Sequence, residues 1–257
     1  MLKIALHIFP LLQISFFIGA ISIYKENLIL ALVLWLVSTL FMNFSLHIVV
    51  HHYVHFRFKS KWIDRVFELF YTLIICMPFN FYRMQHFNHH RYNNLIGDFT
   101  STWKQEKEGI VPSKYFNYSF LWFLGGSVKK WIIQAKSDGD LSEERQTKMK
   151  NEFVFLMLFY GLILYVYPVI ALAYGGLFYF GLSLIATTNY GQHLPLVYGQ
   201  TVGHSYYNKF YNWLFFNNGL HHEHHSHPNL DYPELKEDHK SEISLPHLLM
   251  GPFHRKE

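Results

Sequence analysis

Histidines recur along this chain in four groups whose spacing suits the binding of metal ions. The groups are His47-Ile-Val-Val-His51-His52, His86-Phe-Asn-His89-His90, Asn189-Tyr-Gly-Gln-His193 and His221-His222-Glu223-His224-His225. Imidazole is a good ligand for iron, copper and zinc, and four such groups supply enough nitrogen atoms for two metal ions. The sequence therefore predicts a histidine-rich site for two metals.

Two of the groups share the pattern His-x-x-His-His. On a helix, residues three and four positions apart lie on one face, and these three rings span about 100° of the helical wheel. We therefore expect all three rings of each group to converge on one point. In the last group the overlapping histidine, His222, is an alternative to His221.

The first group is less regular. His47 and His51 lie one helical turn apart, whereas His52 lies about 140° around the helix from His47. We expect His47 and His51 to bind metal, with His52 as the alternative if the helix unwinds there. Five histidines later in the chain that lie outside these groups are expected at the surface, namely His204, His227, His239, His247 and His254.

Long apolar segments must position these groups. Residues 5–24 carry no charge and would form a helix about 30 Å long, the thickness of a bilayer core. Similar segments predict spans over residues 28–50, 153–173 and 175–192, with Gly175 and Gly176 separating the last two. The stretch 66–82 is apolar but interrupted by Glu68, and we expect it to lie in the membrane interface or to re-enter the membrane.

The charges indicate how these spans are oriented. Residues 51–152 hold 15 of the 22 Lys and Arg residues, and the segment after His193 holds five more. Positive charge favours the cytoplasmic side, so both segments and both termini are expected there. The predicted fold is an all-α integral membrane protein with four transmembrane helices as two hairpins. A single domain, 1–257, would then carry a cytosolic helical cap, 51–152 and 193–257, that holds the metal site.

Composition excludes several other classes. The net charge of +4 is too small for a nucleic-acid-binding protein, and the sequence has no arginine-rich arm or alternating basic and aromatic stripe. Cys76 is the single cysteine, so the chain cannot form an internal disulfide or supply the four thiolates of a fused iron–sulfur or rubredoxin module.

In this order the groups resemble the histidine boxes of the membrane fatty acid desaturase superfamily. Box one is HxxxH(H) at His47, His51 and His52, and box two is HxxHH at His86, His89 and His90. An NxxxH motif follows at Asn189 and His193, and box three is HxxHH at His221, His224 and His225. The stretch His225-Ser-His-Pro228-Asn-Leu-Asp231-Tyr232 is similar to the segment that follows box three in acyl-CoA desaturases. The residue after His47 departs from the family, where it is often acidic; here it is Ile48.

The resemblance implies a non-haem diiron enzyme that uses O2 as cosubstrate on the alkyl chain of a lipid. The metal ligands would be the ten box histidines, with Asn189 bound through a water molecule. Asp98, Glu223 and Asp231 are candidates to accept hydrogen bonds from the Nδ1–H groups of the ligand histidines. An external electron carrier (ferredoxin, rubredoxin or cytochrome b5-like) and its reductase would be partners, together with the bilayer and a fatty acyl substrate.

Three functions remain open from the sequence. A fatty acyl desaturase that introduces a C=C bond is the leading hypothesis, and a hydroxylase or ketolase of an alkyl or isoprenoid lipid would use the same site. A membrane metal transporter or metal-binding protein would instead need polar or ionisable residues inside its spans. The last two predicted spans hold few such residues before Asn189.

Overall fold

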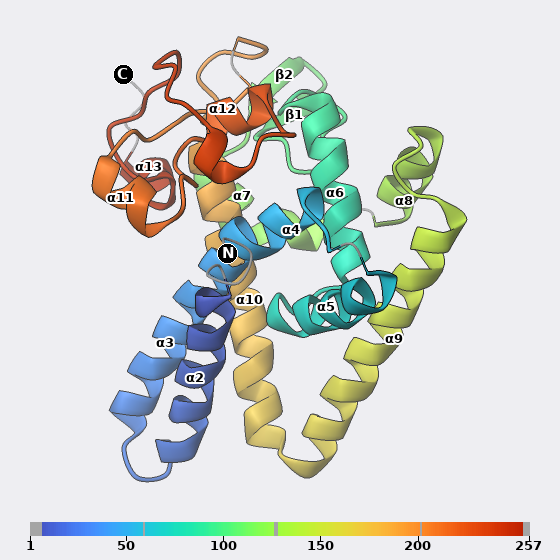
Figure 1. The fold of residues 1–257 in the computed structure, drawn as a ribbon, viewed down its shortest axis with the longest axis vertical. Helices are drawn as coiled ribbons and strands as arrows, with labels where there is room; N and C mark the ends of the chain where they lie inside the picture. Colours follow the sequence, from blue (N-terminus) through green and yellow to red (C-terminus); the bar gives the residue numbers. More distant parts are fainter. Residues whose placement is uncertain (1–6, 59, 126–127, 201, 254–257) are drawn as a thin grey trace. The chain divides into compact units, whose positions relative to one another are not determined.

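The computed structural model describes residues 7–58, 60–125, 128–200 and 202–253, most of them in helices (Figure 1). The chain forms two compact units. Unit 1 comprises Met1–Tyr82 and Glu143–Leu182, and unit 2 comprises Arg83–Ser142 and Ser183–Glu257.

Unit 1 begins with a helical hairpin in which α2 (Ile8–Ile23) lies beside α3 (Leu28–Phe44) (Figure 1). The Asn27 side chain accepts a hydrogen bond from the backbone N–H of Leu30 at 3.0 Å and so begins α3. Buried polar groups also join the two helices, since the Ser38 hydroxyl donates to the carbonyl of Gln13 at 2.9 Å. The two helices lie within or close to the segments predicted over 5–24 and 28–50, although Ala5 and Leu6 lie outside the described residues.

The second helix of this hairpin continues beyond its predicted end. After α3, a π-helix, η1 (Ser45–Val50), leads into α4 (His51–His55), and the whole segment Leu28–His55 is long and apolar enough to cross a membrane. In contrast, α2 has 16 residues and is about 24 Å long, shorter than a bilayer core of about 30 Å. Among the described residues, three helices reach membrane-spanning length.

The other two are α9 (Glu143–Val166) and α10 (Pro168–Gln192). The predicted boundary between them, Gly175-Gly176, is wrong, because the break falls at Tyr167-Pro168. Proline lacks the N–H that would continue the first helix and disfavours helical geometry in the residue before it, yet it fits the first position of a new helix. Gly176 lies inside α10, where a Cβ atom would come within 3.1 Å of the Trp35 ring.

Charged side chains of unit 1 point inward from α5 (Lys61–Ile74), while its exposed face is apolar. Glu68 is fully buried and bonds to Arg65 at 3.0 Å, and Arg65 also reaches Glu152 of α9 at 2.6 Å. Trp62, by contrast, is 74% exposed. An exposed apolar face above a buried ionic network is typical of a helix that lies in a membrane interface. The stretch predicted to lie there, 66–82, contains the end of α5, a turn and the start of α6 (Phe79–Tyr92).

Unit 2 contains the one sheet among the described residues, a hairpin of β1 (Trp103–Glu106) and β2 (Gly109–Pro112) with Trp103 opposite Pro112. The prediction of an all-α chain therefore holds only for the bulk of the fold. Gly109 adopts φ 133°, a backbone conformation that other residues avoid, and it begins the returning strand.

Short helices and loops make up the rest of unit 2. These are α7 (Tyr115–Gly125), α8 (Val128–Ser137), α11 (Lys209–Leu214), α12 (His221–Ser226), η2 (Tyr232–Glu234) and α13 (His247–Phe253). Two of them, α7 and α13, contribute to a core formed by Tyr118, Ala186, Tyr190, Leu194, Ile243 and Met250. The last turns of α10 contribute to this core, so His193, the residue after α10, is held against it.

Candidate metal centre

Four buried histidines of unit 2 form the first cluster, which we call the four-histidine cluster. It consists of His89 on α6, His193 after α10, and His221 and His225 on α12. One ring nitrogen of each lies within 4.8 Å of the corresponding nitrogens of the other three. The Nε2 atoms of His193 and His221 are 2.9 Å apart. Three distant segments thus bring imidazole nitrogens to one point.

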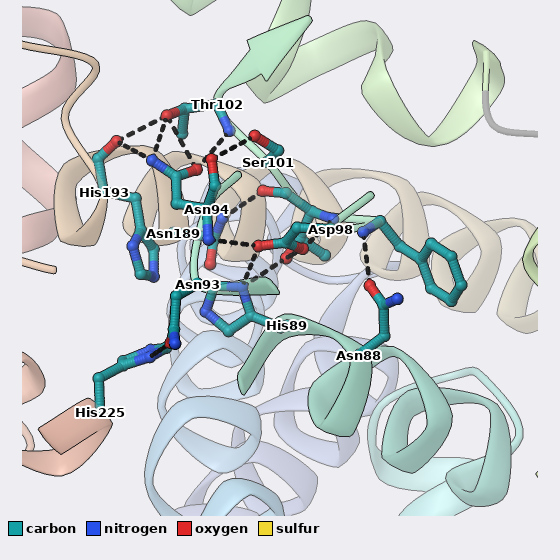
Figure 2. Close-up of polar contacts among 12 residues, drawn as sticks. Asn88, His89, Asn93, Asn94, Asp98, Ser101, Thr102, Asn189, His193 and His225 are labelled. Atoms are coloured by element: carbon teal, nitrogen blue, oxygen red, sulfur yellow. Dashed lines mark hydrogen bonds and ion pairs between the residues drawn. The ribbon is translucent and has the colours of Figure 1, made fainter. Parts of the chain in front are cut away.

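Two of these rings are held from outside by oxygen acceptors (Figure 2). Nδ1 of His89 lies 2.7 Å from Oδ2 of Asp98, and Nδ1 of His225 lies 2.9 Å from Oδ1 of Asn93. The opposite nitrogen, Nε2, of each ring is buried and has no hydrogen-bond partner within the described part of the chain. A buried nitrogen without a partner is costly, so a bound metal fits both positions.

A second group, the three-histidine cluster, consists of His86, His90 and His224 and also belongs to unit 2. Their ligand nitrogens again lie within 4.8 Å of one another, and the Nε2 atoms of His90 and His224 are 3.0 Å apart. The rings of His86 and His90, one turn apart on α6, have centroids 4.5 Å apart.

The expectation that each His-x-x-His-His group converges on one point is wrong. Box two sends His86 and His90 to the three-histidine cluster and His89 to the four-histidine cluster, and box three divides His224 from His225 in the same way. The geometry of the helix explains this split, because residues four apart nearly eclipse while adjacent residues diverge by about 100°. Boxes two and three therefore each contribute to both clusters.

Burial determines the protonation of three histidines in the four-histidine cluster. Removal from water, followed by repulsion from neighbouring histidines, places the pKa values of His193, His221 and His225 well below the ordinary histidine value. Burial alone would raise the pKa of Asp98, but the interaction with His89 and hydrogen bonds from Thr100 outweigh it and lower that pKa. Neutral imidazoles beside an ionised carboxylate are the protonation states that metal binding needs.

The box-one histidines belong to unit 1. His47 lies within η1, and His51 and His52 begin α4; all three are buried. Nδ1 of His51 lies 3.1 Å from the carbonyl oxygen of His47, which leaves its Nε2 directed away from the helix backbone. A π-helical turn is wider than an α-turn and is common at functional sites, and it changes the angle between His47 and His52 on which the sequence prediction depended.

The other predicted site residues have definite partners. Asn189 donates from its amide to the carbonyl of Thr100 at 3.1 Å and to the Tyr118 hydroxyl. Glu223 accepts from the hydroxyls of Ser205 at 2.5 Å and Tyr207 at 2.6 Å.

Asp231 begins η2 as its N-cap. His221, rather than His222, lies in the four-histidine cluster; Nδ1 of His222 lies 3.2 Å from the carbonyl oxygen of Gly203.

Two of the five predicted surface histidines are buried. His204 and His247 are 3% and 0% exposed, and Nε2 of His247 lies 2.9 Å from the carbonyl oxygen of His204. The sequence did not indicate this contact, because neither histidine belongs to a group and the two are far apart along the chain. His227 and His239 are exposed, as predicted, and His254 lies outside the described residues. Asn93 was also missed by sequence reasoning, although it follows box two directly.

Comparison with known proteins gives one result. The family model described as Fatty acid desaturase matches residues 27–248, a range that includes all four histidine groups. Neither the curated proteins nor the solved structures gave a match.

Proposed function

Because this chain belongs to the fatty acid desaturase family, we propose that it is a membrane diiron oxidoreductase that introduces a C=C bond into a fatty acyl chain. One observation carries the proposal, namely the four-histidine cluster with two buried Nε2 atoms that have no partner among the described residues. The three-histidine cluster of the same unit supplies ligands for a second ion.

The donors fit iron in their number and chemistry. Seven imidazoles of unit 2 would hold the metals, and the proposal adds His47, His51 and His52 of box one as further ligands. Nitrogen donors without thiolates suit iron, copper or zinc rather than calcium or magnesium. When bound, two iron ions would supply the O2-dependent chemistry that removes hydrogen atoms from an unactivated C–H bond.

The protein's own residues prepare the site. Asp98 and Asn93 fix which nitrogen of His89 and of His225 faces the cluster. Burial keeps the rings of His193, His221 and His225 neutral and limits the access of water. Asn189, through Thr100 and Tyr118, connects the end of α10 to the segment that holds His89, and we propose that it reaches a metal through a water molecule.

The apolar helices favour a lipid substrate and a multi-pass membrane protein. Leu28–His55, Glu143–Val166 and Pro168–Gln192 are long enough to span. The first of them contains the box-one histidines near its end, and the last ends just before His193. We propose that the metal site and both termini face the cytoplasm. We also propose that electrons come from a separate carrier protein and its reductase.

The test combines metal content with product mass. The full-length protein is expressed in cells that lack this activity, its iron content is measured after purification in detergent, and the cellular lipids are analysed by mass spectrometry. Two irons per chain and acyl chains lighter by two hydrogens would support a desaturase. Gain of an oxygen atom would indicate a hydroxylase or ketolase. Metal transport in vesicles without consumption of O2 would overturn the proposal.

A further inference from the structure

The loop that follows box two, residues 93–102, contacts three of the four histidines in the four-histidine cluster (Figure 2). Asp98 bonds to His89 and Asn93 to His225. The Thr102 hydroxyl donates to the backbone carbonyl of His193 at 2.7 Å. One short segment is therefore connected to candidate ligands on α6, on α12 and directly after α10.

The side-chain amides of Asn88 and Asn94 fix the backbone of this loop. Asn88 on α6 accepts from the backbone of Phe99 at 2.8 Å and donates to the carbonyl of Gly97 at 3.1 Å. The Asn94 side chain accepts from the backbone N–H of Thr102 at 2.7 Å, and the backbone N–H of Asn94 donates to Asp98 at 2.9 Å. These hydrogen bonds fix the conformation of the loop within unit 2, and no metal is needed for them.

Asn93 occupies an unusual backbone position within this loop. Its φ is +46°, in the left-handed region that asparagine and glycine tolerate and that most other residues avoid. This conformation ends α6 and turns the Asn93 side chain toward α12, where Oδ1 meets Nδ1 of His225 at 2.9 Å. An amide oxygen can only accept, so this contact requires the proton of His225 to be on Nδ1 and leaves Nε2 as the free ligand atom.

We propose that Asn93 is a positioning residue for the metal centre, which holds His225 as Asp98 holds His89. The inference rests on the proposed function, because it assigns Asn93 a role only if the four-histidine cluster binds metal. A single loop then selects the ligand nitrogen of two histidines on separate helices before any ion arrives. Outer partners of this kind typically change metal affinity by about 10- to 100-fold.

The experiment uses two substitutions that both accept the left-handed backbone. Asn93→Gly removes the acceptor while allowing φ +46°, and Asn93→Asp retains an oxygen acceptor. Asn217→Gly is the matched control, because Asn217 also has a positive φ (61°) in unit 2 but bonds to the carbonyl of Tyr232. Each full-length variant is purified in detergent, freed of metal, and titrated with Co²⁺ while the visible absorption of the bound ion is recorded.

We expect Asn93→Gly to weaken Co²⁺ binding about 10- to 100-fold and to change its absorption spectrum. Asn93→Asp should restore both, and Asn217→Gly should bind as the wild type does. Equal affinity and spectra for Asn93→Gly and the wild type would overturn the positioning role while leaving the metal site intact. So would equal weakening in Asn217→Gly, because the effect would then be a general loss of stability. A wild-type protein that binds no Co²⁺ or Fe²⁺ would overturn the proposed function itself.

Discussion

Asp98 and His89 form a buried pair in which Oδ2 lies 2.7 Å from Nδ1, while the opposite ring nitrogen of His89 has no partner among the described residues. The carboxylate is also surrounded by donors, since it accepts from the backbone of Asn94 at 2.9 Å and of Thr100 at 2.7 Å. This carboxylate therefore fixes the ring of His89 and organises the loop around it.

Replacing Asp98 by asparagine should weaken metal binding. The new amide group would bring its own N–H bonds to a place where other donors already converge, and the negative charge beside His89 would be lost. We expect metal affinity to fall by about 10- to 100-fold, measured by titration with Fe²⁺ under anaerobic conditions. Asp231→Asn is the control, because asparagine serves equally well as the N-cap of η2. Similar losses in both variants would argue against the role of Asp98.

Loss of a ring from the three-histidine cluster should abolish activity. Replacing His90 or His224 by alanine removes one of two Nε2 atoms that face each other at 3.0 Å. We expect no detectable product and a reduced iron content, while insertion into the membrane continues. His239→Ala, at a ring that is 59% exposed, should retain both activity and iron. Full activity in His90→Ala would contradict the assignment of this cluster.

The metal-free protein should lose stability as the pH falls below about 6.5, the ordinary histidine value. His193, His221 and His225 resist protonation in the fold because they are buried and repel one another. The unfolded chain binds more protons in this range, so the free energy of unfolding falls as the pH falls. The loss is about 1.4 kcal/mol per pH unit for each ring that stays neutral. Thermal unfolding in detergent, followed by tryptophan fluorescence after chelation, would measure it. An unchanged midpoint between pH 7 and pH 5.5 would contradict this expectation.

Substitution of Gly191 should disturb both the core of unit 2 and His193. A Cβ atom at this position would lie 1.9 Å from the backbone oxygen of His247, so α10 or α13 must move. We expect Gly191→Ala to lower stability by about 1–3 kcal/mol or more, seen as a lower melting temperature and weaker metal binding. Gly161→Ala in α9 is the control, because nothing lies within 4 Å of a Cβ atom there. A stable, metal-binding Gly191→Ala protein would show that the contact is not rigid.

The apolar helices and the histidine groups could be predicted because their signals are local. Charge-free segments indicated α2, α3 and α10, and the spacing of His86, His89 and His90 indicated one helix. The sharing of each box between two clusters could not be predicted, because the helical wheel gives directions around a helix without showing which other segments lie there. The same reason accounts for His247, which is buried by its contact with the backbone of His204.

Local signals did not locate the break between α9 and α10, and they did not indicate the role proposed for Asn93. Glycine is a weak helix former in water, yet Gly176 inside the apolar helix α10 allows the close approach of Trp35. Asn93 gave no sequence signal of its own, since a left-handed asparagine at a helix end is common in any fold.

Helix α6 carries His86, His89 and His90, and so provides rings to both clusters from one continuous backbone. Consecutive residues of a helix rise by a constant amount, about 1.5 Å, and no hinge separates the two sets of rings along it. The spacing between the two ions would therefore be a property of the helix itself, and neither position could shift while the other stayed in place.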